Sequence, residues 1–137
     1  MKLAIISDMH FGFDGNILVR PSGTGYIVDA GVNSYYRKML DAFGDIECEG
    51  YRLDYLVLLG DILDFSISPY DKAYKIARVF FQKLRSDNVA KNYIYIPGNH
   101  DCDIWHTVEH QVNIVNTVAK GQEPRDFKHS VDRKSVV

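Results

Sequence analysis

The sequence has 137 residues, of which 46% are hydrophobic and 25% are charged, the composition of an ordinary globular domain. A formal net charge of −2 excludes a general electrostatic attraction to nucleic acid or to anionic membranes. Two cysteines, Cys48 and Cys102, are too few for a disulfide framework and indicate free thiols in a reducing compartment. The first apolar run, residues 3–6, is too short for a signal peptide or a membrane span, so we expect a cytoplasmic protein.

The first third of the chain predicts a strand, a hairpin and a helix. Residues 3–6 form a continuous apolar run, as expected of a strand that is covered on both faces. A segment containing Pro and Gly lies between two short apolar runs and predicts a small hairpin within residues 17–28. Apolar residues at helical spacing then predict a helix over residues 33–43, with Asn33 or Ser34 as its N-cap.

The middle of the chain repeats this alternation of strand and helix. Residues 54–59 predict a second strand, and residues 92–96 predict a third. Between them, Ser68 as N-cap, Pro69 at the first helical position and Asp71 as a capping-box carboxylate predict the start of a helix. The buried face of this helix is predicted to carry five residues at helical spacing: Ala73, Ile76, Ala77, Phe80 and Leu84.

A last helix is predicted over residues 103–119, with Gly121 closing it. Its inward-facing residues are predicted to be Trp105, Val108, Val112, Val115 and Ala119. From Gln122 onward the chain is polar. We therefore expect one domain over residues 1–121, followed by a polar tail or a truncated remainder over residues 122–137.

The order of these elements indicates the fold class. Strands that alternate with helices predict an α/β fold with a mostly parallel sheet and flanking helices. The carboxyl ends of parallel strands meet at one edge of the sheet, where open α/β sheets bind their ligands. Each predicted strand is followed there by polar side chains: Asp8 and His10 after the first, Asp61 after the second, and Asn99 and His100 after the third.

These side chains suit a metal site. Carboxylate, imidazole and amide oxygen are ligands for Mn²⁺, Fe or Zn²⁺. Asp8 and His10 are two residues apart and can turn toward one ion, while the Asp61 carboxylate, arriving from a neighbouring strand, can bridge two ions. His100 is then free to face a substrate, and Asp101 can orient it and stabilise its charge.

Three motifs carry a resemblance to a known family. Asp8-Met9-His10, Gly60-Asp61-Ile62-Leu63-Asp64 and Gly98-Asn99-His100-Asp101 are similar, in order and in strand context, to the first three motifs of the calcineurin-like metallophosphoesterases. The likeness covers roughly residues 1–105. It implies a dinuclear metal centre, with manganese favoured over iron or zinc, that hydrolyses a phosphomonoester or a phosphodiester.

The resemblance also implies a role for each motif residue. Asp8 and His10 hold the first ion, Asp61 bridges the two ions, and Asn99 holds the second ion. His100 stabilises or protonates the phosphoryl oxygens, and Asp64 supports the ligands without binding an ion itself. The implied partner is a phosphate ester substrate. A nucleic-acid substrate has no support from charge, because the Lys and Arg residues are scattered over predicted helix faces.

The chain also departs from the family pattern. The family's later motifs, a histidine after a strand and a Gly-His-x-His turn, are absent, since the remaining histidines are His106, His110 and His129. The family fold is a sandwich of two sheets, and this chain has strands for about half of it. The alternative function is therefore that of a catalytically incompetent fragment acting as a structural or interaction module. A half-sandwich leaves apolar sheet surface exposed, which favours a homo-oligomer or an absent remainder of the chain.

Two other interpretations are disfavoured. His106-Thr107-Val108-Glu109-His110 matches the H-x-x-E-H signature of zinc peptidases, but both histidines fall away from the apolar stripe of the predicted helix and no third-ligand motif follows. Taken singly, Asp61 and Asn99 also fit simple turn or cap roles. Their occurrence together with Asp8, His10 and His100 makes the metal site the better interpretation.

Overall fold

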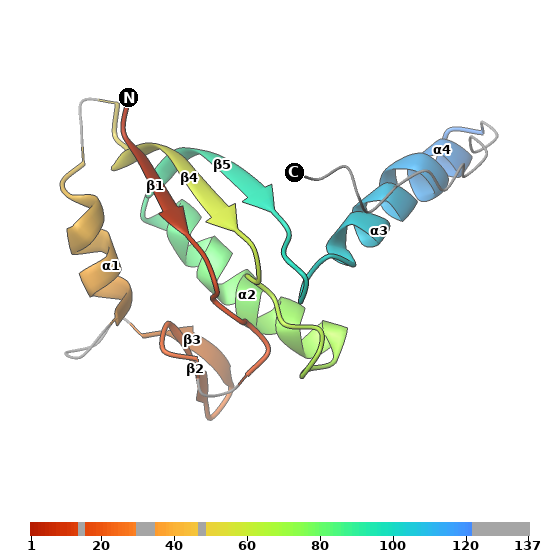
Figure 1. Ribbon diagram of the computed structural model, residues 1–137, viewed down its shortest axis with the longest axis horizontal. Coiled ribbons are helices and arrows are strands. Elements are labelled where there is room, and N and C mark those ends of the chain that lie inside the picture. The colour runs from red at the N-terminus through yellow and green to blue at the C-terminus, as the bar shows by residue number, and fades with distance from the viewer. Residues whose placement is uncertain (14–15, 30–34, 47–48, 122–137) are drawn as a thin grey trace. The chain divides into compact units, whose positions relative to one another are not determined.

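A parallel sheet of three strands forms the centre of the structure. The strands are β1 (Leu3–Ile6), β4 (Leu53–Leu59) and β5 (Ala90–Ile96), hydrogen-bonded in the order β1-β4-β5 (Figure 1). All three strands predicted from the apolar runs are confirmed, although β4 begins one residue earlier and β5 two residues earlier than expected. Parallel pairing on both sides of β4 places the three carboxyl ends at the same edge of the sheet.

The computed structural model describes residues 1–13, 16–29, 35–46 and 49–121. Several predicted features lie outside the described residues: the N-cap candidates Asn33 and Ser34, Cys48, and the polar tail 122–137. The chain divides into two units, Met1–Cys102 and Asp103–Val137. Across the part of the chain that is described, no helix has the length and apolar character needed to span a membrane.

Helix α2 (Tyr70–Ser86) lies across one face of the sheet (Figure 1). Its five predicted core residues are confirmed, because none of them is more than 2% exposed. The centroid of the Phe80 ring lies 6.2 Å from that of the Tyr36 ring of helix α1 (Tyr35–Phe43). This edge-to-face contact packs the two helices against each other. The predicted hairpin is also confirmed as β2 (Val19–Ser22) and β3 (Gly25–Val28), and it packs against α2.

The start of α2 differs from the prediction. Pro69, not Ser68, is the N-cap, and no side chain caps the helix. Ser68 is turned inward, since a Cβ atom built on Gly12 would lie only 2.8 Å from the Ser68 Cβ. The Asp71 carboxylate pairs with Lys75 at 3.0 Å and therefore does not close a capping box. Packing between two loops thus overrides a local capping signal.

The second unit consists, where it is described, of consecutive helical turns: α3 (Ile104–Glu109), the π-helical segment η1 (His110–Val115) and α4 (Asn116–Ala119). This confirms a helical segment close to residues 103–119. The expected inward face is wrong, because Trp105, Val108 and Val115 are 59%, 48% and 41% exposed and Ala119 is exposed as well. The Val112 side chain lies outside the described residues. A helix buries an apolar stripe only against a second layer, and the described part of this unit contains none.

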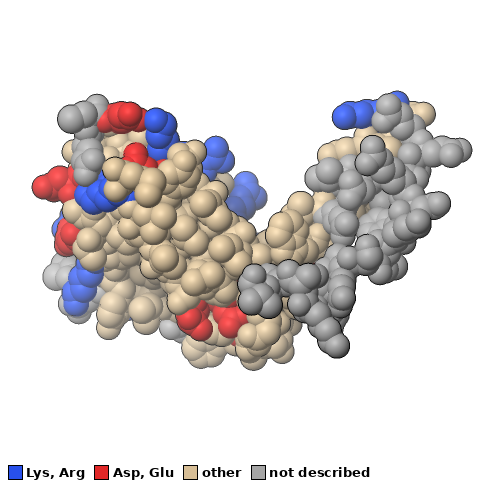
Figure 2. Space-filling view, turned by 45° about the horizontal axis from the view of Figure 1, so that its top comes forward, with Lys and Arg blue, Asp and Glu red and all other residues tan. Residues whose placement is uncertain are grey.

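The sheet face opposite α2 carries exposed apolar side chains. Leu3 and Ile5 of β1 are 46% and 58% exposed, and Ile94 and Ile96 of β5 are 41% and 40% exposed. Figure 2 shows a broad area without charged side chains on this side of the first unit. The expectation that β1 is covered on both faces is therefore wrong for the described residues, while the predicted exposed apolar sheet surface is confirmed. The fold class is α/β, with a parallel sheet and flanking helices, consistent with half of a metallophosphoesterase-type sandwich.

Candidate metal centre

The loops that follow β1 and β4 run side by side beyond the ends of the strands. The backbone N–H of Asp8 donates to the carbonyl oxygen of Gly60 (3.1 Å), and that of His10 donates to Asp61 (2.9 Å). The Gly60 N–H in turn donates to Ile96 at the end of β5 (2.7 Å). The three strand ends are therefore held together by backbone bonds, and the polar residues after them are carried into one place.

Three residues of this region have left-handed backbone conformations. The φ angles of Asp8, His10 and Asp61 are 55°, 48° and 52°. A non-glycine residue pays about 1–2 kcal/mol for such a conformation. Residues held this way cluster at functional sites, where the surrounding structure maintains them. Here the backbone hydrogen bonds between the two loops provide that support.

The side chains of these same three residues converge. One ligand atom each from Asp8, His10 and Asp61 can be chosen so that all lie within 4.8 Å of one another. The Asp8 and His10 side chains are 70% and 37% exposed, so the group is open to solvent and to a ligand. Asn99 follows β5 at the same edge and is exposed. The two carboxylates and the imidazole that converge here fit a divalent metal ion.

Gly98 makes room for the Asp61 carboxylate. A Cβ atom on Gly98 would lie 2.3 Å from Asp61 Oδ1 and 2.7 Å from the Asp61 nitrogen, distances that no real side chain tolerates. The backbone N–H of His100 donates to the same Oδ1 at 2.9 Å, and no described residue hydrogen-bonds Oδ2. The turn after β5 therefore fixes one oxygen of Asp61 and leaves the other for an ion.

Asp64 is a buried carboxylate that binds both histidines. It is 3% exposed, its Oδ2 lies 2.9 Å from His10 Nδ1, and its Oδ1 lies 3.2 Å from His100 Nδ1. The Ser66 hydroxyl also donates to Oδ1 at 2.5 Å. Burial by itself raises the pKa of Asp64, but the hydrogen bonds from Ser66, His10 and His100 outweigh it and hold that pKa well below its ordinary value.

An ionised carboxylate only accepts hydrogen bonds, so it determines which nitrogen of each ring carries the proton. Both His10 and His100 present Nδ1 to Asp64, which makes Nδ1 the protonated nitrogen and leaves Nε2 for an ion or a substrate. The two rings meet edge to face with centroids 5.1 Å apart. The hydrogen bond to Asp64 raises the pKa of His100, partly opposed by desolvation, and the charges of Asp64, Asp61 and Asp101 add to the rise.

Asp101 has a different position from the one expected. It is fully buried, and its carboxylate accepts hydrogen bonds from the N–H groups of Ile62 (2.8 Å), Leu63 (3.2 Å) and Gly98 (2.5 Å) and from the Tyr95 hydroxyl (2.5 Å). Asp64, not Asp101, is the carboxylate bonded to His100, because the turn directs neighbouring side chains to opposite sides. Asp101 acts on His100 only as a nearby charge and ties the β4 loop to the β5 loop.

The remaining predicted features fall outside this cluster. His106 and His110 are exposed on the second unit, and neither belongs to a group of three potential metal ligands within the described ranges. His129 lies outside the described residues. The Cys102 thiol is exposed and contacts the carbonyl oxygen of Asn99 at 3.6 Å.

Comparison with known proteins adds one positive finding. The sequence model of the calcineurin-like phosphoesterase family matches residues 1–135. No curated protein and no solved structure matches the chain. The matched region spans the whole cluster around Asp8, Asp61 and Asp64, and the parallel α/β sheet agrees with it. On this match and this geometry, the chain is a member of the calcineurin-like phosphoesterase family with a candidate His/Asp metal-binding group.

Proposed function

We propose that this chain hydrolyses a phosphomonoester or a phosphodiester at a centre for two divalent metal ions. The main support is the convergence of Asp8, His10 and Asp61 within 4.8 Å at the carboxyl ends of the strands. His100 stands beside this group in a fixed orientation. The combination favours hydrolysis over the non-catalytic alternative, because a purely structural module has no need for open ligands on strained backbone.

The ligands present fit the ions that the family implies. Asp8 and His10 would hold the first ion, Asp61 would serve both ions, and Asn99 would hold the second. When bound, such ions lower the pKa of water and neutralise charge on phosphoryl oxygens. Three of these four donors are oxygen atoms, which favours Mn²⁺ over Fe or Zn²⁺.

The role proposed for His100 follows from its hydrogen bonds. Nδ1 is engaged by Asp64 and by Ser66 Oγ, at 3.2 and 2.9 Å, so Nε2 points away from this pair. The raised pKa keeps a larger share of the ring protonated at neutral pH. An imidazolium in this position can donate a hydrogen bond to a phosphoryl oxygen and a proton to the departing alcohol.

Asp61→Asn tests the proposal. The full chain is loaded with Mn²⁺, desalted and assayed with p-nitrophenyl phosphate and bis(p-nitrophenyl) phosphate. We expect Mn²⁺-dependent hydrolysis that Asp61→Asn and His100→Ala each abolish, with unchanged far-UV circular dichroism. Asp71→Asn, an exposed carboxylate on α2 paired with Lys75, is the matched control and should keep the wild-type rate. Wild-type rates in Asp61→Asn, or no retained Mn²⁺ in the wild type, would overturn the proposal.

A further inference from the structure

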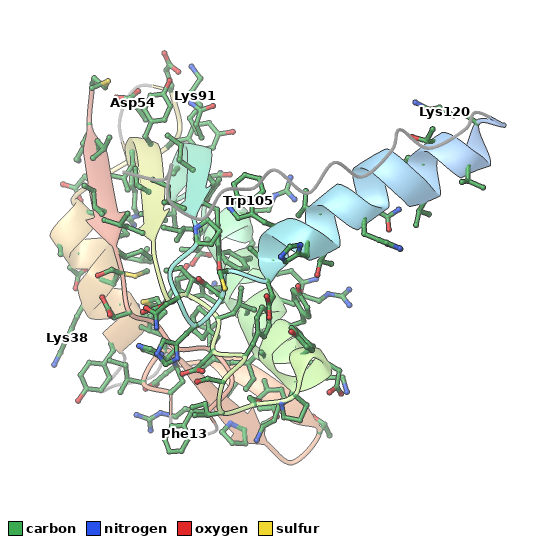
Figure 3. The ribbon with its side chains drawn as sticks, turned by 45° about the vertical axis from the view of Figure 1, so that its right-hand side comes forward. Phe13, Lys38, Asp54, Lys91, Trp105 and Lys120 are labelled. Carbon is green, nitrogen blue, oxygen red and sulfur yellow. The ribbon has the colours of Figure 1, made fainter. Side chains whose placement is uncertain are left out.

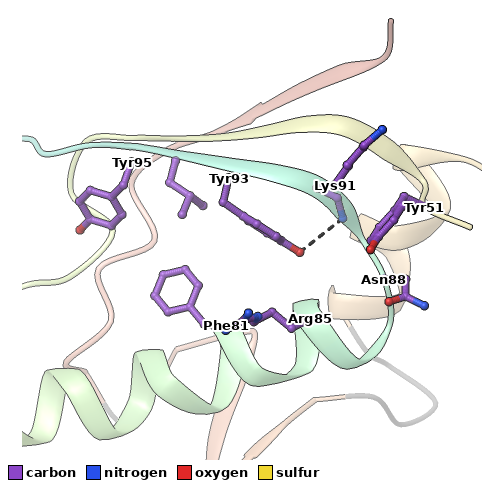
Figure 4. Close-up of a pocket in the computed structure, with 9 residues that line it drawn as sticks. Tyr51, Phe81, Arg85, Asn88, Lys91, Tyr93 and Tyr95 are labelled. Carbon is purple, nitrogen blue, oxygen red and sulfur yellow. Dashed lines mark hydrogen bonds between the residues drawn. The ribbon is translucent and has the colours of Figure 1, made fainter. Parts of the chain in front are cut away.

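A second candidate site lies in the first unit, between β5 and the C-terminal half of α2. It is a pocket of about 470 Å³, within the range of small-molecule sites. Figure 4 shows Phe81 and Arg85 reaching from α2 toward Tyr93 and Tyr95, which project from β5. Tyr51, from the loop before β4, closes one end.

The pocket combines aromatic walls with an apolar floor. Phe81 and the three tyrosines Tyr51, Tyr93 and Tyr95 are all partly accessible, and Tyr93 is 37% exposed. Deeper in, Leu58 and Ala90 are each 3% exposed. Aromatic faces that line an open pocket favour planar ring systems, because such rings stack on them and are removed from water.

Arg85 supplies a positive charge to this pocket. Its guanidinium has no ion pair among the described residues, whereas the ammonium of Lys91 is paired with Glu49 at 2.5 Å. Burial raises the pKa of Tyr93, and the nearby positive charge of Arg85 opposes part of that rise. A guanidinium presents a planar fork of donors that matches an anionic oxygen group.

The pocket is distinct from the metal centre. Figure 3 shows Lys91 with Asp54 at one end of the strands and Phe13, which belongs to the loop after β1, at the other. Among the described residues that line the pocket, only Tyr95 has a side-chain hydrogen bond to the loops after β4 and β5, from its hydroxyl to Asp101. A ligand here would therefore touch no proposed metal ligand.

We propose that this pocket binds a planar aromatic ring that carries an anionic group, with the ring against Phe81 and Tyr93 and the anion on Arg85. The juxtaposition of a guanidinium without an ion pair and several aromatic rings carries the proposal. It is independent of phosphate ester hydrolysis, because no residue in it belongs to the metal centre.

The test uses the full chain without metal, in EDTA, and isothermal titration with three probes. AMP carries both the ring and the anion, adenosine carries the ring alone, and inorganic phosphate carries the anion alone. We expect AMP to bind at least tenfold more tightly than either of the other two. Arg85→Gln should weaken AMP binding at least tenfold and leave adenosine unchanged, while Phe81→Leu should weaken both. Arg78→Gln, an exposed arginine on the same helix that does not line the pocket, is the matched control.

The assignment is overturned if AMP does not bind, if Arg85→Gln binds AMP as the wild type does, or if phosphate alone binds as tightly as AMP. Asp61→Asn separates the two sites: it should keep wild-type AMP affinity in EDTA, and a loss there would place AMP at the metal centre instead. Circular dichroism of each variant verifies that the fold is retained.

Discussion

Asp64 and Asp101 are both buried carboxylates at the carboxyl ends of the strands, yet only Asp64 bonds to the histidines, while Asp101 bonds to backbone N–H groups of two different loops. Asp64 accepts hydrogen bonds from the side chains of His10, His100 and Ser66, and from the backbone N–H groups of Ser66 and Ile67 in its own turn. Asp101 accepts mainly from the backbone N–H groups of the two loops that flank it. The first arrangement orients imidazoles, and the second holds loops together.

The two carboxylates therefore have different expected roles: Asp64 supports the proposed reaction, and Asp101 supports the folded structure. Removing a carboxylate that orients functional rings should reduce activity more than stability. Removing a carboxylate that satisfies buried backbone donors should reduce stability, because those donors then have no acceptor. Four predictions follow from the contrast, from the largest expected effect to the smallest.

Asp64→Asn should lower the rate of phosphate ester hydrolysis about 10²–10³-fold, within the range for a general acid that is lost. The amide oxygen can accept from one histidine only, and the amide nitrogen then faces the Nδ1–H of the other ring. The free energy of unfolding should change by less than about 2 kcal/mol. Steady-state kinetics and urea titration measure the two quantities on the same preparation. Full activity in Asp64→Asn would remove this residue from the proposed mechanism.

Asp101→Asn should lower the free energy of unfolding by about 3 kcal/mol, because a buried charged acceptor is replaced by a group that cannot satisfy all its donors. Urea unfolding of the metal-free protein is the measurement. Asp41→Asn, an exposed carboxylate on α1, is the control and should change stability by less than about 0.5 kcal/mol. An equally small effect in Asp101→Asn would mean that the loops do not depend on this carboxylate.

Ser66→Ala should reduce kcat about tenfold, a typical loss for a residue that orients a functional group. The Ser66 hydroxyl lies 2.9 Å from His100 Nδ1 and donates to Asp64, so it helps to hold the ring. Ser66→Thr keeps a hydroxyl and should restore most of the rate, and the pH profile of kcat/KM should shift only in the alanine variant. If both variants are equally impaired, the role of Ser66 is packing.

The pH dependence of stability should show the smallest effect. The pKa of His100 is raised above 6.5 in the folded protein, so its contribution is fully present below that pH and is lost as the pH rises through the folded value. The pKa of Asp64 is lowered from 3.8, so its contribution is lost only when the pH falls through the lower folded value. The melting temperature of the metal-free protein should therefore fall as the pH rises above 6.5 and through the raised pKa of His100. His100→Gln should flatten that change, and an unaltered slope would contradict the assignment.

The sequence predicted more of the fold than of the contacts inside the site. The strands, the hairpin and the buried face of α2 follow from apolar periodicity, which is a local property. The polar residues after each strand were predicted to meet, because parallel strands end at one edge. The outward face of residues 104–119 was not predictable in the same way, since the helical period does not say whether a second layer covers it.

The features missed at the site share one cause. The inward turn of Ser68, the need for Gly98 and the shared hydrogen bonding of Ser66 all depend on neighbours distant in the sequence. A local signal was present for Ser66, because an aspartate side chain commonly accepts a hydrogen bond from the backbone N–H two residues on, as Asp64 does from Ser66 at 3.0 Å. The second partner of Ser66, His100, is 34 residues away, so no local sequence pattern indicates that contact.

What the sequence by itself determined is the set of candidate ligands and the edge of the sheet at which they gather, because residue type and strand period are local. Tertiary structure decided which carboxylate orients the histidines. Asp64 and His10 are 54 residues apart, and their hydrogen bond exists only because β1 and β4 pair in parallel and carry both loops to the same side. Asp101 is next to His100 in sequence, yet the turn after β5 directs its carboxylate into the backbone of the β4 loop.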